Sequence, residues 1–309
     1  MAQIENTAII GAGVIGASWA ALFLAAGKHV DVYEPAEDGE AKVRDYVANA
    51  WPVLEELGLA ARGNPDAIAF HADAGSAVRN AQFVQESVPE RIDIKHGIYA
   101  EFEPHLRSDA IVSSSASGLT LTEMQGGWKD PSRFVLGHPF NPPHLIPLVE
   151  VMGNERTADG VLEETDAFYE DVGKTTIRVN KEVPGHVSNR LQAALWREAI
   201  HLVAEGVASV EDVDKAVWAG PGLRWAAMGP HMLFNLAAGP GGMEEFCNRY
   251  GPSFHRWWED MGSPEINADI AGMLVSGLAD EAHGKDVKEL ARSRDQLIVA
   301  MQKAMTGLR

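Results

Sequence analysis

Short apolar runs alternate with longer helical patterns along the first part of the chain. The runs that predict strands are rich in β-branched residues and lie at residues 7–10, 29–33, 83–86, 111–114, 134–136 and 148–152, and the run 175–179 can add a final edge strand. Apolar residues at helical spacing occupy 14–26 and 92–106. Strands that alternate with helices predict right-handed βαβ units and a mostly parallel sheet.

The pattern changes after residue 184. Helical periodicity runs through 187–205 and 210–218, and helices are expected to dominate as far as Arg309, with Gly- and Pro-rich loops at 220–222 and 239–242. A chain of 309 residues is long enough for two domains. We therefore expect an α/β fold with a Rossmann-type doubly wound sheet at residues 1–184, followed by an all-α domain at 185–309.

Composition and charge narrow the class of protein. The formal net charge of −18 predicts no nucleic-acid partner and no anionic membrane partner, because the electrostatic attraction has the wrong sign. No apolar run approaches the roughly 20 residues needed to span a bilayer, and the N-terminus does not resemble a secretory signal. The single cysteine, Cys247, leaves no internal disulfide and no Cys-based metal cluster. We expect a cytoplasmic enzyme with a small-molecule substrate and no metal site.

A glycine-rich loop follows the first expected strand. Gly11, Gly13 and Gly16 have the G-x-G-x-x-G spacing, and Val14 and Ile15 complete the loop at the head of the next helix. In dinucleotide-binding folds these glycines allow a tight turn, a close approach of the pyrophosphate and close packing of helix on strand. The helix N-terminus offers free N–H groups to the phosphates. By itself the loop predicts either a dinucleotide site or a structural turn.

An acidic residue at the end of the second strand favours the dinucleotide. Glu34 lies 23 residues after Gly11, where a carboxylate binds the ribose hydroxyls and repels a 2′-phosphate. No arginine follows it closely, since the next residues are Pro35, Ala36 and Glu37. The sequence therefore predicts NAD rather than NADP.

A histidine and a glutamate twelve positions apart are the main candidates for chemistry. His138 lies just past the expected strand 134–136, at the sheet edge where open α/β folds bind ligands, and Glu150 alternates with apolar residues on the next strand. Oxidation of an alcohol needs a base for the hydroxyl proton, and imidazole titrates in a useful range. A carboxylate on its other ring nitrogen would set its tautomer. Taken without context, His138 is equally a packed loop histidine.

Several motifs, in the same order, resemble those of the L-3-hydroxyacyl-CoA dehydrogenase family nearly end to end. They are the glycine loop, residues 90–95, 113–118 and 137–144, the segment Pro-Gly-His-Val-Ser-Asn-Arg at 184–190, and the loop 220–230. The chain resembles most the branch that holds L-carnitine dehydrogenase and lambda-crystallin, an L-gulonate 3-dehydrogenase. The resemblance implies an NAD-dependent dehydrogenase that oxidises the 3-hydroxyl group of a small L-3-hydroxy acid to a keto group.

The resemblance also implies roles for individual residues. His138 corresponds to the family's general base and Glu150 to the carboxylate that orients it. Ser117 matches the serine that hydrogen-bonds the reacting oxygen. Asn189 matches the asparagine that reaches in from the helical domain, which implies an active site between the domains.

The cofactor side of the site rests on the same resemblance. Glu90 and Lys95 keep the family's spacing and are expected to contact the nicotinamide-side ribose, and Asn141 belongs to the same cofactor and substrate cluster. His186 departs from the family pattern, because many acyl-CoA members carry phenylalanine there. His144 follows two prolines and can line the pocket or lie on the surface.

The charge of one segment bears on the substrate. A CoA thioester carries phosphates that need lysine or arginine partners. Residues 36–66, which correspond to a basic segment in the acyl-CoA members, contain seven acids and three bases here. This balance favours a free hydroxy acid over a CoA thioester.

Arg224 and Trp225 lie in a loop that resembles the corresponding loop of the same branch. Arg224 could bind a substrate carboxylate as a fork, and an aromatic face could hold a quaternary ammonium, although tryptophans on helices more often belong to a core or a dimer interface. We expect carnitine first and L-gulonate next. A short-chain 3-hydroxyacyl-CoA dehydrogenase and a non-catalytic, crystallin-like NAD-binding protein remain the alternatives. The resemblance further implies a homodimer.

Overall fold

The computed structural model describes residues 3–307, and the chain forms two compact units. The first unit comprises the chain up to Arg190 together with Ile298–Lys303, and the second comprises Leu191–Leu297 and the end of the chain. The division therefore lies close to the boundary that we expect at residue 184, which stays a prediction.

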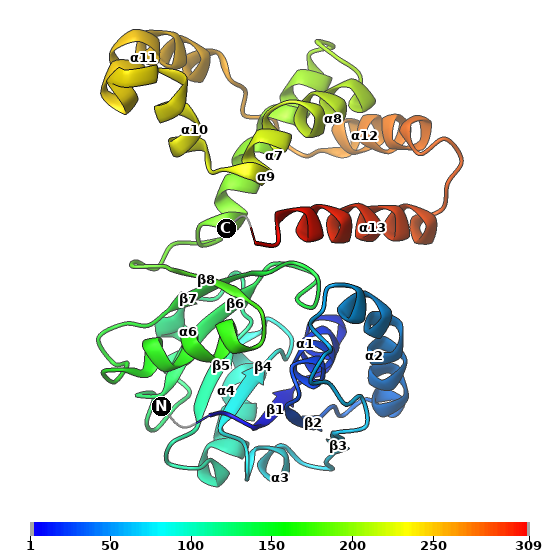
Figure 1. The fold of residues 1–309 in the computed structure, drawn as a ribbon, viewed down its shortest axis with the longest axis vertical. Helices are drawn as coiled ribbons and strands as arrows, with labels where there is room; N and C mark the ends of the chain where they lie inside the picture. The colour runs from blue at the N-terminus through cyan, green and yellow to red at the C-terminus, as the bar shows by residue number, and fades with distance from the viewer. Residues whose placement is uncertain (1–2, 308–309) are drawn as a thin grey trace. The chain divides into compact units, whose positions relative to one another are not determined.

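One sheet organises the first unit (Figure 1). Its eight strands have the order β3-β2-β1-β4-β5-β6-β7-β8. The strands are β1 (Asn6–Ile10), β2 (His29–Tyr33), β3 (Ile68–Phe70), β4 (Phe83–Glu86), β5 (Ile111–Ser114), β6 (Phe134–Pro139), β7 (Leu148–Met152) and β8 (Thr175–Arg178). All neighbouring strands are parallel except β6 and β7, which are antiparallel. The order reverses between β1 and β4, which is where open α/β sheets bind ligands.

Helices cover both faces of this sheet, because alternate strand residues point to opposite sides. On one face, Ile9 and Val135 pack in a core with α1 (Val14–Ala25), α2 (Gly39–Glu56) and α6 (Val161–Asp171). On the other face, Val84 and Phe134 pack with α3 (Ala74–Val78), α4 (Ile92–Phe102) and α5 (Leu121–Gln125). A short 3-10 helix, η1 (Glu103–His105), follows α4. The predicted Rossmann-type sheet is confirmed.

The chain after β8 is helical, as predicted. Its elements are α7 (Ser188–Ala204), α8 (Val210–Ala219), α9 (Pro221–Ala227), α10 (Pro230–Ala237), η2 (Gly239–Gly241), α11 (Gly242–Asp260), α12 (Ala268–Glu281) and α13 (Val287–Met305). A small core in the second unit centres on Val203, Val210 and Val213. Of the helices between residues 3 and 307, none is both long and apolar enough to cross a bilayer.

Candidate active site

The glycine loop between β1 and α1 has the geometry that a dinucleotide requires. Gly11 has a φ of +83°, which side-chain-bearing residues rarely adopt, and a Cβ there would come within 2.9 Å of the backbone of Val88. A Cβ on Gly16 would collide with the carbonyl oxygen of Gly11. At Gly13 nothing lies within 4 Å of a Cβ position, and α1 has no side-chain N-cap. Open space next to free N–H groups fits a pyrophosphate.

Glu34 lies beside this loop at the end of β2. Its Oε2 accepts a hydrogen bond of 2.7 Å from the backbone N–H of Ala12, and its Oε1 accepts one of 3.1 Å from Ala36. The half-buried carboxylate is therefore held next to the glycine loop, where the adenosine ribose of a dinucleotide binds in this fold.

His138 and Glu150 form a buried pair at the same edge of the sheet. They are direct register partners on the antiparallel strands β6 and β7, and opposite residues of such a pair point to the same face. His138 Nδ1 lies 2.7 Å from Glu150 Oε2, and the two residues are 6% and 1% exposed. His138 lies within β6, not past its end as the sequence suggested, because pairing with β7 extends the strand to Pro139.

The second carboxylate oxygen of Glu150 binds the start of α7. Glu150 Oε1 accepts hydrogen bonds of 2.9 Å from the backbone N–H groups of Val187 and Ser188. Burial alone would raise the pKa of Glu150, but the hydrogen bonds from His138, Ser188 and Val187 lower it to about 2. The carboxylate is thus ionised at neutral pH and can only accept. His138 therefore carries a proton on Nδ1, and its Nε2 is free to act as a base.

Glu90 and Ser117 contact each other. Glu90 Oε1 accepts hydrogen bonds from the backbone N–H groups of Ser117, Gly118 and Leu119, and Glu90 Oε2 accepts one of 3.2 Å from the Ser117 hydroxyl. Although burial acts in the opposite direction, these donors lower the pKa of Glu90. The sequence placed the two residues in separate roles, and the pairing of Glu90 with the loop after β5 was not foreseen.

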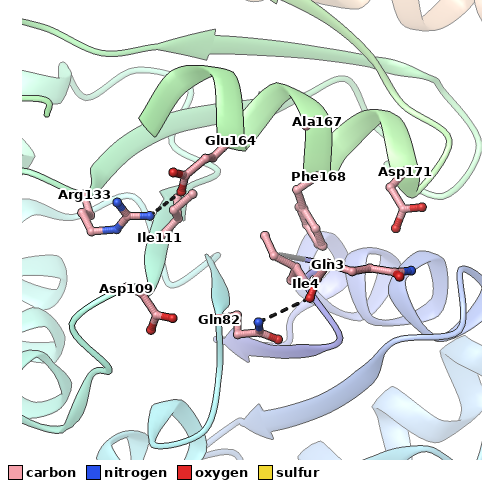
Figure 2. Close-up of a pocket in the computed structure, with 10 residues that line it drawn as sticks. All are labelled: Gln3, Ile4, Gln82, Asp109, Ile111, Arg133, Glu164, Ala167, Phe168 and Asp171. Carbon is pink, nitrogen blue, oxygen red and sulfur yellow. Dashed lines mark hydrogen bonds and ion pairs between the residues drawn. The ribbon is translucent and has the colours of Figure 1, made fainter. Parts of the chain in front are cut away.

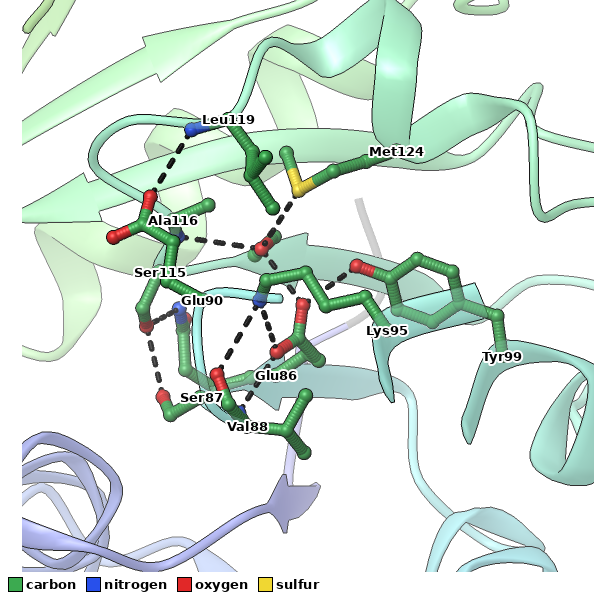
Figure 3. A network of polar contacts seen from close by, with 12 residues as sticks. Glu86, Ser87, Val88, Glu90, Lys95, Tyr99, Ser115, Ala116, Leu119 and Met124 are labelled. Carbon is green, nitrogen blue, oxygen red and sulfur yellow. Dashed lines mark hydrogen bonds and ion pairs between the residues drawn. The ribbon is translucent and has the colours of Figure 1, made fainter. Parts of the chain in front are cut away.

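Lys95 belongs to a buried network around Glu86, which Figure 3 shows. Lys95 Nζ lies 2.6 Å from Glu86 Oε1, and the hydroxyl groups of Tyr99 and Ser114 each donate to Glu86 Oε2 at 2.7 Å. Glu86 and Lys95 are 0% and 1% exposed. The ammonium group of Lys95 thus pairs with the carboxylate of Glu86 at the end of β4. Glu86 and Lys95 also bind the backbone of Val88, which holds the loop that carries Glu90. A contact between Lys95 and the cofactor stays a prediction.

Sequence reasoning did not single out Glu86. The available signal was an acidic residue at the end of a strand that begins with two apolar residues, nine positions before Lys95. A buried carboxylate in such a place needs a cationic partner, because an unpaired charge in a core is strongly destabilising.

The loop between β6 and β7 is fastened to the sheet and to α1. His144 Nδ1 makes a hydrogen bond of 2.8 Å with the hydroxyl group of Ser18, which also accepts from the His144 backbone N–H at 2.9 Å. Lys174 Nζ donates to the carbonyl oxygens of Pro143 and Ile146, both at 2.6 Å. Burial lowers the pKa of Lys174 to about 7. These contacts fix the loop that leads from His138 to Glu150.

The remaining predicted site residues lie in different parts of the chain. Asn189 is in the first turn of α7 and belongs to the first unit, together with His138. Asn141 is exposed, two residues after the end of β6. Arg224 and Trp225 are exposed on α9 in the second unit. Their roles stay predictions.

A cavity of about 470 Å³ lies at the opposite edge of the sheet (Figure 2). Its lining residues precede or begin β1, β4, β5 and β6: Gln3, Ile4, Gln82, Asp109, Ile111 and Arg133, with Glu164, Ala167, Phe168 and Asp171 from α6. Two of the lining residues, Arg133 and Glu164, form an ion pair of 2.6 Å. Because ligands of open α/β sheets bind at the carboxyl ends of the strands, this cavity is not the active site.

Comparison with protein families finds two matches that together cover most of the chain. Residues 6–183 match the NAD binding domain of 3-hydroxyacyl-CoA dehydrogenase, and residues 185–265 match the C-terminal domain of the same enzyme. The prediction of NAD as the cofactor is confirmed, since the glycine loop and Glu34 lie in the first of these domains.

Individual relatives are similar along nearly the whole chain. L-carnitine dehydrogenase of Streptomyces coelicolor is 44% identical over 302 residues, which cover 98% of this chain and 95% of that protein. L-carnitine dehydrogenase of Pseudomonas putida is 41% identical over 303 residues, covering 98% of this chain and 94% of that protein. These matches confirm that the protein is an NAD-dependent dehydrogenase of 3-hydroxy acids.

A solved structure shows the same architecture. The crystal structure of 5-formyl-3-hydroxy-2-methylpyridine 4-carboxylic acid 5-dehydrogenase, described as an NAD+ dependent dismutase, has a TM-score of 0.84 with this chain and is 31% identical to it. The similarity covers 99% of both chains. The Rossmann-type sheet followed by helices is thus shared with an NAD-dependent enzyme.

Proposed function

The chain belongs to the 3-hydroxyacyl-CoA dehydrogenase family, and on this basis we propose that it oxidises the 3-hydroxyl group of L-carnitine with NAD. The buried pair of His138 and Glu150 at the carboxyl edge of the sheet is the observation that carries the chemistry. The substrate itself is proposed from the relatives. They are L-carnitine dehydrogenases, and their similarity to this chain extends over nearly their full length.

The His138–Glu150 pair is arranged for removal of a hydroxyl proton. The ionised Glu150 keeps the proton of the ring on Nδ1, so His138 Nε2 takes the proton of the substrate hydroxyl group. NAD, held by the glycine loop and Glu34, would supply the acceptor for the hydride of the carbon that carries this hydroxyl group. The imidazolium that forms lies beside a negative charge, which stabilises it. Ser117 and Asn189 are proposed to hold the reacting oxygen.

The charges that follow β2 support a free acid over a CoA thioester. Residues 36–66 hold seven acids against three bases. Each base is already in an ion pair: Lys42 with Asp38, Arg44 with Glu40, and Arg62 with Asp171. Such exposed pairs are weak, but the acids around them remain in excess, and CoA phosphates would meet a negative surface.

Residues outside the His138–Glu150 pair are proposed to bind the cofactor and the two charged groups of the substrate. Glu90, Lys95 and Asn141 are proposed to lie at the nicotinamide side of the cofactor. Arg224 is exposed and makes no ion pair within residues 3–307, and its guanidinium is proposed to bind the carboxylate of the substrate. The face of Trp225, which is 38% exposed, is proposed to hold the quaternary ammonium group by cation–π attraction.

The assembly and location of the enzyme are also proposed. Large apolar side chains are exposed on the second unit, with Trp218, Trp257 and Trp258 at 66%, 57% and 60%. Such a surface supports a homodimer, which light scattering of the purified protein would test. A functional boundary at residue 184 is supported by the junction of the two family matches. A cytoplasmic location is supported by the single cysteine and is tested by cell fractionation.

A substrate panel tests the proposed function. The purified protein is assayed for NADH formation with L-carnitine, L-gulonate, 3-hydroxybutyrate and 3-hydroxybutyryl-CoA. The highest kcat/KM is expected for L-carnitine, and His138→Gln should abolish turnover while leaving the affinity for NAD unchanged. A higher kcat/KM for the CoA thioester would replace the proposal with an acyl-CoA dehydrogenase. Turnover of none of them would support a non-catalytic NAD-binding protein.

A further inference from the structure

His186 is a buried histidine whose ring lies beside the ring of the proposed base. Its side chain is 3% exposed, and its ring centroid lies 5.2 Å from that of His138. Within the described residues, neither Nδ1 nor Nε2 of His186 has a hydrogen-bond partner. The residue also has a φ of +49°, in the left-handed region that side chains other than those of Asn, Asp and His seldom adopt.

The unpartnered ring nitrogens and the left-handed backbone of His186 both destabilise the folded state. A buried polar group without a partner destabilises the folded state by about 1–3 kcal/mol, and a left-handed backbone adds to this cost. Native structures keep such costs mainly where a group serves binding or catalysis. The neighbouring residues Val187 and Ser188 give their backbone N–H groups to Glu150, so the segment that places the ring is tied to the catalytic pair.

The surroundings of His186 determine its protonation state. Burial is the main cause that lowers the pKa of His186, against the opposite effects of the Ala116 carbonyl and of the Glu150 and Glu90 carboxylates. The ring is therefore neutral at pH 7 and presents one N–H donor and one acceptor nitrogen. The Ala116 carbonyl is near the ring but outside hydrogen-bond geometry, so the N–H donor is left for an oxygen of the ligand.

We propose that His186 binds the substrate and donates a hydrogen bond to its carboxylate, next to the hydroxyl group held by His138. The inference rests on the proposed function. In a 3-hydroxy acid, three carbon atoms link the two polar ends, so their oxygens lie roughly 3–5 Å apart. Two rings with centroids 5.2 Å apart match this span. A quaternary ammonium group has no lone pair, so the carboxylate is the acceptor that L-carnitine offers to His186.

Ligands that differ only in the carboxylate test this contact without turnover. Binding to the enzyme saturated with NADH is measured by calorimetry for 4-trimethylammoniobutyrate, which lacks the hydroxyl group, and for propyltrimethylammonium, which also lacks the carboxylate. His186→Phe keeps a ring without nitrogens. It should raise the Kd of the first ligand about ten- to hundredfold, as for a lost hydrogen bond to a charged group, and leave that of the second unchanged.

A second variant protects the test against a folding defect. Asparagine tolerates the left-handed backbone and keeps an N–H donor, so His186→Asn should bind 4-trimethylammoniobutyrate more tightly than His186→Phe does. Melting temperature and Kd for NADH are the controls for the fold of both variants. Equal weakening of both ligands by His186→Phe, or an unchanged Kd for the first ligand, would overturn the inference.

Failure of the proposed function gives a different result. If the substrate panel identifies another hydroxy acid, L-carnitine is wrong as the substrate, and the same comparison with that acid and its uncharged amide tests His186 alone. If only the CoA thioester reacts, no free carboxylate is present and both proposals are overturned. If L-carnitine reacts but His186→Phe changes the Kd of both ligands by the same factor, only the role of His186 is overturned.

Discussion

Replacing Glu150 with glutamine removes the charge beside His138 and nearly preserves the shape of the side chain. In the structure, Glu150 Oε2 accepts from His138 at 2.7 Å while Oε1 accepts from Val187 and Ser188 at 2.9 Å. A glutamine has one oxygen and one NH2 group. If its oxygen keeps the two backbone donors, its NH2 group donates to His138 Nδ1. The ring proton then moves to Nε2, and the base is lost.

The expected loss is large because the wrong tautomer cannot accept the substrate proton. For a carboxylate–histidine pair in which the amide replaces the acid, kcat falls about 10⁴-fold in a serine protease, and we expect about 10³- to 10⁴-fold here. The affinity for NAD should not change, because Glu34 and the glycine loop, which are proposed to hold the adenosine side of the cofactor, are unaltered.

Stability provides a second measurement on the same variant. The pKa of Glu150 is lowered from 4.5 to about 2, so in the folded state the carboxylate keeps its charge to lower pH than in the unfolded chain. This difference contributes on the order of 3 kcal/mol at pH values above 4.5, and the contribution disappears as the pH falls from 4.5 towards 2. Glu150→Gln should lack this pH dependence. Urea denaturation at neutral and acidic pH would show it as a smaller change in the free energy of unfolding for the variant than for the original protein.

Steady-state formation of NADH measures the catalytic effect, and quenching of protein fluorescence measures NAD binding. Glu37→Gln is the matched control, since it removes one negative charge from an exposed position after β2. The control should have the kcat of the original protein. A kcat of Glu150→Gln within tenfold of the original, in a protein that melts normally, would refute the assignment of Glu150 as the group that sets the tautomer of His138.

Three further substitutions test other parts of the site. Glu34→Gln should lower the ratio of kcat/KM for NAD to that for NADP by about tenfold, because the acid repels a 2′-phosphate, and an unchanged ratio would count against its role. Lys95→Met should destabilise the protein by about 3–5 kcal/mol in urea denaturation, since Glu86 is left buried without a cation, whereas a change below 1 kcal/mol would contradict the pairing. Burial holds the pKa of Lys174 at about 7, below the ordinary 10.5, so the unfolded chain binds more protons between these values and the free energy of unfolding rises with pH across this window. Lys174→Met should lack that rise, and equal slopes for both proteins would show that Lys174 is not the titrating group.

Local signals predicted much of the first unit. The spacing of Gly11, Gly13 and Gly16 and the position of Glu34 depend on one turn between neighbouring elements, and the structure places Glu34 beside that turn. The alternation of strands and helices predicted the parallel sheet for the same reason, since each apolar run is short and continuous in the chain. The three-residue strand β3 (Ile68–Phe70) was missed, because so short a run has no readable period.

The sequence did not predict which side chains and loops pair with each other around the sheet. Lys95 was expected at the cofactor, but the fold places Glu86 at the end of β4 directly against it. Glu90 was assigned to a ribose, and the fold places the N–H groups of the loop after β5 around its carboxylate. Each pairing depends on which strands are neighbours and on how a loop returns, and no spacing in the chain specifies these.

The pair of His138 and Glu150 shows most clearly what the sequence determined and what the tertiary structure decided. The sequence by itself determined that His138 follows an apolar run, that Glu150 lies in the next one, and that a base and a carboxylate are available for alcohol oxidation. Only the tertiary structure decided that β6 and β7 are antiparallel with these two residues in register, and that the start of α7 donates two N–H groups to the same carboxylate. Hydrophobic periodicity acts over a few residues, whereas strand direction, register and the placement of a helix end depend on contacts between distant segments.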